Sequence, residues 1–75
     1  MNSSIELVKF SSPQEAYNTL IKRKNELEKR MNEIIMLRKQ NKLSESEFNR
    51  EKRKIEREFI EVMDRIMQLK FILNK

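Results

Sequence analysis

This chain of 75 residues contains no cysteine, no histidine and no glycine. Without cysteine and histidine it has neither disulfides nor a zinc site of the usual kind, which are the common supports of small cores. It also lacks the residue types most used for nucleophilic and acid–base catalysis, and any glycine-rich loop to hold a phosphate. We therefore expect a non-enzymatic protein, with no cofactor and no metal, that gains stability by association.

Interruptions and apolar runs are also scarce. The single proline is Pro13, so nothing breaks residues 14–75, and 39% charged with 7% aromatic residues is typical of long exposed helices. No stretch approaches the ~20 apolar residues of a membrane span, and no basic start precedes an apolar run, as it would in a signal peptide. We expect no membrane span and, with no cysteine present, a cytoplasmic location.

The segment Leu43–Phe48 has the pattern of a complete helix start. Ser44 can accept a hydrogen bond from the backbone of Glu47, and the Glu47 carboxylate can reach back to the backbone of Ser44. Leu43 and Phe48 flank this capping box where an apolar pair fixes the angle of the incoming chain. The pattern lies between two long helical segments and therefore predicts a helical hairpin.

The limits of both helices follow from similar signals. Ser12 is a second N-cap, with Pro13 in the first turn and Glu15 three residues after the cap. Asn41 suits the left-handed position that ends a helix. We predict an extended or flexible leader at 1–11 and a helical hairpin over 12–75, with helices at about 13–41 and 45–74 and a turn at 41–44.

Both predicted helices carry apolar residues at alternating steps of three and four, as in a heptad seam. In the first helix the row is Tyr17, Leu20, Leu27, Met31 and Ile34, with Lys24 and Arg38 in the remaining positions. In the second it is Phe48, Ile55, Phe59, Val62, Ile66, Leu69 and Leu73, with Lys52 as the one polar member. Antiparallel pairing places Lys24 opposite Val62, where we expect its ammonium to reach water or one of Glu58 and Glu61.

A second apolar stripe runs along the neighbouring side of the second helix, formed by Ile60, Met63, Met67 and Phe71. Together the two stripes cover roughly 200° of the helix, against the ~100° of an ordinary surface helix. One partner helix covers only the first stripe. We therefore predict an all-α antiparallel hairpin that dimerises through the second stripe into a four-helix bundle.

Basic residues are concentrated near the turn. Residues 38–54 hold seven basic and three acidic side chains, within a chain of net charge +5. Candidate contacts to the phosphates of RNA or DNA are Arg38, Lys39, Lys42, Arg50, Arg53 and Lys54. No aromatic residues are interleaved with them to stack on bases, so a solvated charged surface is the other interpretation.

Two resemblances accompany these patterns. The residues Ile34, Leu37, Asn41, Leu43–Phe48, Lys52, Lys54 and Ile55 resemble the short C-terminal (SHOCT) helical-hairpin module, over about a third of the chain. In length and layout the whole chain is similar to Rop-like homodimeric hairpin proteins, including small hairpin proteins of crenarchaeal spindle-shaped viruses. The second resemblance implies a homodimeric four-helix bundle. Rop binds paired RNA loops, and the viral proteins are regarded as adaptors.

These observations lead to three hypotheses for the function. The first is an adaptor or assembly protein that associates with itself and binds an unidentified protein partner. The second is a nucleic-acid-binding bundle that uses the basic residues near the turn. The third is a coiled-coil subunit of a larger hetero-complex, docked through the stripe at 60–71.

Overall fold

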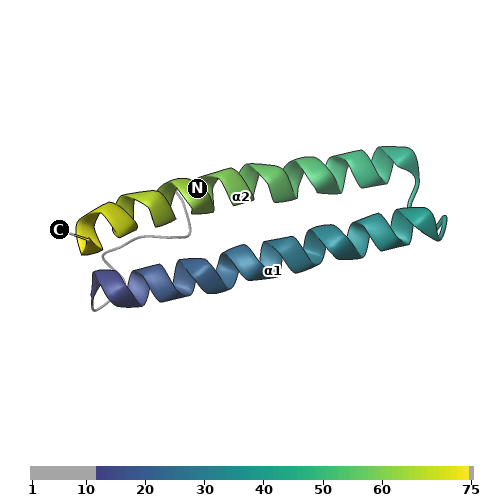
Figure 1. The fold of residues 1–75 in the computed structure, drawn as a ribbon. Coiled ribbons are helices and arrows are strands. Elements are labelled where there is room, and N and C mark those ends of the chain that lie inside the picture. Colours follow the sequence, from purple (N-terminus) through teal and green to yellow (C-terminus); the bar gives the residue numbers. More distant parts are fainter. Residues whose placement is uncertain (1–11, 75) are drawn as a thin grey trace.

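The computed structural model describes residues 12–74 and shows two helices, α1 (Pro13–Lys39) and α2 (Glu45–Leu73). The helices run antiparallel, side by side along their whole length, and one tight turn joins them (Figure 1). No strand occurs within residues 12–74, so the described part of the chain is an all-α hairpin. The predicted leader at 1–11 and the final residue lie outside the described residues.

Helix α1 begins as its sequence predicts and ends two residues before the predicted limit. The Ser12 hydroxyl accepts a hydrogen bond from the Glu15 backbone N–H at 3.1 Å. At the other end, Asn41 takes the left-handed conformation (φ 59°), which confirms the prediction for this residue. A residue in this conformation cannot continue a helix, so α1 stops at Lys39.

The turn after α1 satisfies the helix's last carbonyl groups. The Lys42 N–H donates to the Leu37 carbonyl at 2.8 Å, and the Asn41 N–H donates to the Arg38 carbonyl at 3.1 Å. These two bonds form a Schellman motif, in which a left-handed residue lets the chain turn back over the helix end. The turn therefore reverses the chain direction within a few residues.

The capping box at the start of α2 is confirmed. The Glu47 N–H donates to the Ser44 hydroxyl at 3.0 Å, and the Ser44 N–H donates to the Glu47 carboxylate at 2.9 Å. Leu43 and Phe48 are both half-buried against the core. The start of α2 is thus held by reciprocal hydrogen bonds and by apolar packing on either side of them.

The core lies between the helices and follows the predicted rows closely. Leu20, Ile34 and Val62 are its largest fully buried side chains. Burying each contributes about 1.5–3 kcal/mol. The buried set is Ala16, Leu20, Leu27, Ile34, Ile55, Val62, Ile66 and Leu69. The other apolar members of the predicted rows are half-buried against this set, except for Leu73, which is 37% exposed at the last position of α2. Of the polar members, Lys24 and Arg38 are half-buried and Lys52 is exposed.

Ion pairs cross between the helices on one side of this core, which we call the ion-pair flank. Arg23 donates to the Glu58 carboxylate through Nε at 2.6 Å and Nη2 at 2.8 Å, and Arg30 lies 3.7 Å from Glu51. Lys24 instead pairs along its own helix with Glu28, at 3.5 Å. Of the outcomes predicted for Lys24, only the choice of carboxylate is wrong: it reaches Glu28 rather than Glu58 or Glu61, and Glu58 is bound by Arg23.

Candidate functional surfaces

The side of the hairpin opposite the ion-pair flank carries the predicted second stripe, and we call it the apolar flank. Ile60, Met67 and Phe71 are 62%, 65% and 73% exposed. Met63 is half-buried and packs against the core, so the expectation that α1 leaves the entire stripe uncovered is wrong for this residue. Met63 lies four residues after the half-buried Phe59 and three before the buried Ile66, which places its side chain at the boundary of the core.

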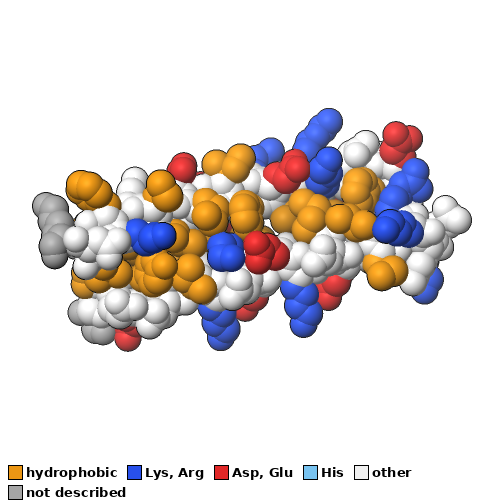
Figure 2. Space-filling model, viewed as in Figure 1, with side chains coloured by type: hydrophobic (Ala, Val, Ile, Leu, Met, Phe, Trp, Pro, Cys, Tyr) orange, Lys and Arg blue, Asp and Glu red, His pale blue; other side chains and the backbone are white. Residues whose placement is uncertain are grey.

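A groove of about 640 Å³ lies on the apolar flank, between the helices and near their midpoints. Its apolar lining comes from both helices and consists of Leu27, Met31, Ile55, Phe59 and Ile60, with Glu28, Asn32 and Glu56 at its rim. Figure 2 shows a face on which hydrophobic side chains form a band along the molecule over both helices, with charged side chains beside and within it. The groove is therefore part of an extended apolar surface.

The ion-pair flank is closed by comparison. A hollow of about 310 Å³ lies there, about half the volume of the groove on the apolar flank. Arg23, Arg30, Glu51 and Glu58 line it and cross-link the two helices above the core. The two sides of one hairpin thus differ in chemistry: one is covered by charged pairs, and the other presents apolar side chains around an open groove.

The ion pair on this flank also changes the acidity of its members. The hydrogen bonds from Arg23, offset in part by desolvation, lower the pKa of the Glu58 carboxyl below its ordinary value of 4.5. The same hydrogen bonds raise the pKa of Arg23. Both groups are therefore charged near neutral pH, and the pair favours one register of α1 against α2.

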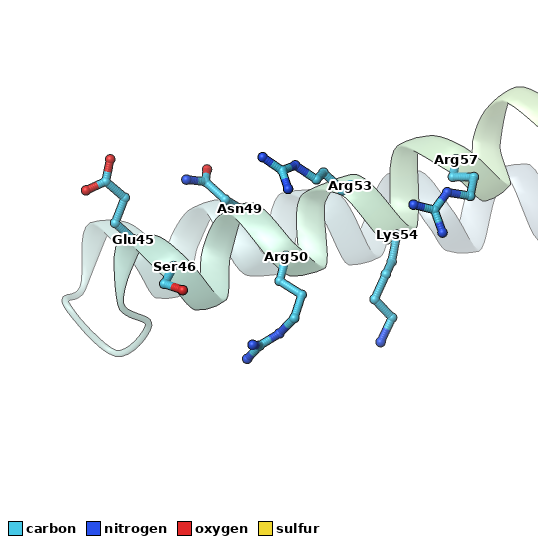
Figure 3. A pocket seen from close by; sticks show the side chains of 7 residues that line it. All are labelled: Glu45, Ser46, Asn49, Arg50, Arg53, Lys54 and Arg57. Carbon is cyan, nitrogen blue, oxygen red and sulfur yellow. The ribbon is translucent and has the colours of Figure 1, made fainter.

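A second surface, the basic face, lies on the outer side of α2 just after the turn. It is a shallow region lined by Glu45, Ser46, Asn49, Arg50, Arg53, Lys54 and Arg57, all from α2 (Figure 3). Arg50, Arg53 and Arg57 are exposed and form no ion pair within residues 12–74. Lys54 Nζ lies 3.8 Å from Glu51 and is 66% exposed. Four cations thus lie within two helical turns of one another.

The six predicted nucleic-acid contacts do not come together on this face. Arg50, Arg53 and Lys54 belong to it, whereas Arg38 and Lys39 lie at the end of α1 and Lys42 lies in the turn. The Arg38 guanidinium is half-buried and donates to the Leu43 carbonyl at 3.3 Å, which explains its place at the end of the core row. Lys39 and Lys42 are exposed beside the turn.

Sequence reasoning missed Arg57 as a member of the basic face. It lies four residues after Arg53 and seven after Arg50, a spacing that places all three on one side of a helix, so the signal was present in the sequence. The two-pronged contact between Arg23 and Glu58 was also missed. That contact joins residues of different helices, and only their relative rotation determines which charges meet.

Within residues 12–74 no three acidic side chains come together in a way that could hold a metal ion. Nor does either helix of that part combine the length and hydrophobicity needed to cross a membrane. No protein-family model, curated protein or solved structure matches this chain. The apolar flank and the basic face are therefore the surfaces that bear on function.

Proposed function

We propose that this chain is a non-enzymatic assembly or adaptor protein whose hairpin pairs with a second copy to form a four-helix bundle. The observation that supports the proposal is the apolar flank, where Ile60 and Met67 are 62% and 65% exposed beside an apolar groove. Burial of each such side chain favours association by about 1.5–3 kcal/mol. A standard interface covers about 800 Å² per partner, a modest share of the 5864 Å² surface of this chain.

The adaptor role follows from the surfaces that would remain exposed after two copies associate. Pairing through the apolar flank leaves the basic face of α2 accessible, as well as the outer side of α1. A bundle would then display two copies of the basic face on one rigid body, and bivalent display strengthens binding to a repetitive partner without any new contact. The bundle thus acts by holding charged surfaces at a set spacing.

Sedimentation equilibrium tests the self-association with a matched pair of variants. Met67 and Met36 are both exposed helix residues, at 65% and 55%, but only Met67 belongs to the apolar flank. We expect the wild type and Met36→Glu to be dimers and Met67→Glu to be a folded monomer by sedimentation and circular dichroism. A wild-type chain that stays folded and monomeric at every concentration would refute the proposal and favour a subunit of a hetero-complex.

A second candidate function, nucleic-acid binding, is supported by the basic face. Arg50, Arg53 and Arg57 project from one side of α2 without acidic partners within the described residues. No aromatic residue lines this face, so binding would depend on phosphate contacts rather than on base stacking. Such contacts are strongest at low ionic strength, since they release counterions.

Fluorescence anisotropy with labelled RNA and DNA across a salt series tests this second function. We expect Arg50→Glu/Arg53→Glu to weaken binding more than Lys22→Glu/Lys29→Glu, which makes the same charge change on exposed residues of α1. The salt dependence should also become shallower only in the first variant. Undetectable binding of the wild type near ~50 mM salt, or equal losses in both variants, would rule out a specific role for the basic face.

A further inference from the structure

The order of residues along the apolar flank of α2 specifies more than dimerisation. We infer that α2 packs antiparallel against α2 of a second copy, with the two-fold axis passing close to Met63. The inference rests on the proposed self-association and names the contact surface and the orientation of the two hairpins. Its starting point is the series Glu56, Ile60, Met63, Met67 and Lys70, which follows one side of the helix in steps of four, three, four and three.

This series is complementary to itself when it is reversed. With Met63 on the axis, positions equally far before and after it face each other across the interface. Glu56, seven residues before Met63, then faces Lys70, seven residues after it, and Phe59 faces Met67. Because a two-fold contact occurs twice, one pairing gives two salt bridges between copies, one at each end of an apolar segment.

The groove of the apolar flank fits the same alignment. The Met67 side chain, 65% exposed, faces Phe59 of the second copy, and Phe59 lines the groove. The Met67 side chain of one copy therefore meets the groove in the middle of the other.

Charge disfavours the obvious alternatives. Placing groove on groove would bring the Glu28 and Glu56 carboxylates of both copies together, because both residues line its rim. A parallel contact between the two α2 helices would set Glu56 against Glu56 and Lys70 against Lys70. Like charges at such close positions are destabilising. Glu56 and Lys70 are exposed within the single hairpin, where they form no ion pair with any residue of 12–74.

Disulfide trapping tests the position of the axis, and the absence of cysteine from the chain makes it clean. Only a residue near the axis lies close enough to its own copy, within about 7 Å between Cα atoms, to form a symmetric disulfide. We expect Met63→Cys to give a covalent dimer under mild oxidation. Met36→Cys, on the outer side of α1, should give none above the level of random collision.

Charge reversal tests the orientation independently. Glu56→Lys sets lysine against Lys70, and Lys70→Glu sets glutamate against Glu56, so each variant alone should dimerise roughly tenfold more weakly. Mixing the two variants should restore wild-type affinity in a heterodimer, because both cross-pairs are then of opposite charge. Native mass spectrometry distinguishes the heterodimer from the two homodimers.

The outcomes separate this inference from the function on which it rests. A monomeric wild type refutes the self-association itself. A dimeric wild type whose Met63→Cys variant does not cross-link, and whose charge variants do not complement each other, overturns the antiparallel α2 contact and leaves the self-association standing. Cross-linking together with complementation supports both.

Discussion

At the scale of single residues, a few polar side chains determine where the helices begin and end. Ser12 and Ser44 each accept a backbone hydrogen bond at a helix start, and Asn41 supplies the left-handed residue between the helices. These roles depend on groups within four residues of one another. They could therefore be predicted from the sequence before any packing was known.

Removal of the second cap should destabilise the hairpin. Ser44→Ala takes away the acceptor of the Glu47 N–H and half of the capping box, and we expect a loss of about 1 kcal/mol in the free energy of unfolding. Ser46→Ala is the matched control, since Ser46 is an exposed serine in the first turn of the same helix. Urea unfolding at fixed protein concentration measures both. An equal loss in the two variants would contradict the capping role.

The bond between Arg23 and Glu58 predicts an acid-dependent stability. The folded-state pKa of Glu58 is lowered, so its contribution is complete above the ordinary value of 4.5 and is lost as the pH falls below that value and through the lowered folded-state pKa. We expect Glu58→Gln to lose less than about 1 kcal/mol at pH 7, since both side chains are partly exposed, at 42% and 35%.

The pH profile distinguishes this effect from general destabilisation. Thermal unfolding from neutral pH down through the acid range should show a shallower acid loss in Glu58→Gln than in the wild type. Some acid dependence should remain, because hydrogen bonds from Ser44 also lower the pKa of Glu47. Parallel pH profiles for the two proteins would show that Glu58 does not contribute to the loss of stability in acid.

At the scale of the helices, the hairpin depends on a narrow row of buried side chains. The alternating spacing predicted most of that row, but Lys52 and Leu73 are exposed, and mid-helix members such as Met31 and Phe59 are only half-buried. The periodicity of the sequence predicts which face of a helix is buried, but not the length over which the partner helix covers that face. The exposure of Leu73, at the final turn of α2, is a consequence of that limit.

Shortening a buried side chain of this row should strongly destabilise so small a core. Leu20 is fully buried, and Leu20→Ala should cost about 2–5 kcal/mol, enough to unfold much of the protein. Met36→Ala, at a 55% exposed position of the same helix, should change stability by less than about 0.5 kcal/mol. Chemical unfolding followed by circular dichroism compares them. Similar effects in both variants would contradict the assigned core.

At the scale of the whole molecule, the two flanks determine what the hairpin can do. The ion-pair flank is covered by contacts such as that between Arg23 and Glu58, whereas the apolar flank carries the groove and Met67. Sequence reasoning predicted the excess apolar surface of α2. It did not predict the groove, which requires Leu27 and Met31 of α1 to lie beside Ile55 and Phe59 of α2.

If association completes the fold, stability should depend on protein concentration. We expect the melting temperature to rise by roughly 3–6 °C for each tenfold increase in concentration, since mass action favours the dimer. Differential scanning calorimetry over two decades of concentration measures this shift. Met67→Glu, which removes an apolar contact of the proposed interface, should abolish it. A wild-type melting temperature independent of concentration would contradict an obligate dimer.

The amino-acid sequence alone determined the helices, their caps, the turn and the row of side chains that becomes the core. Each of these depends on groups close together along the chain or on a regular repeat. Only the tertiary structure decided that Arg23 holds Glu58, that Met63 packs against the core, and that ion pairs cover one flank while an apolar groove lies on the other. Those outcomes depend on the rotation and axial position of one helix against the other, which no local pattern specifies.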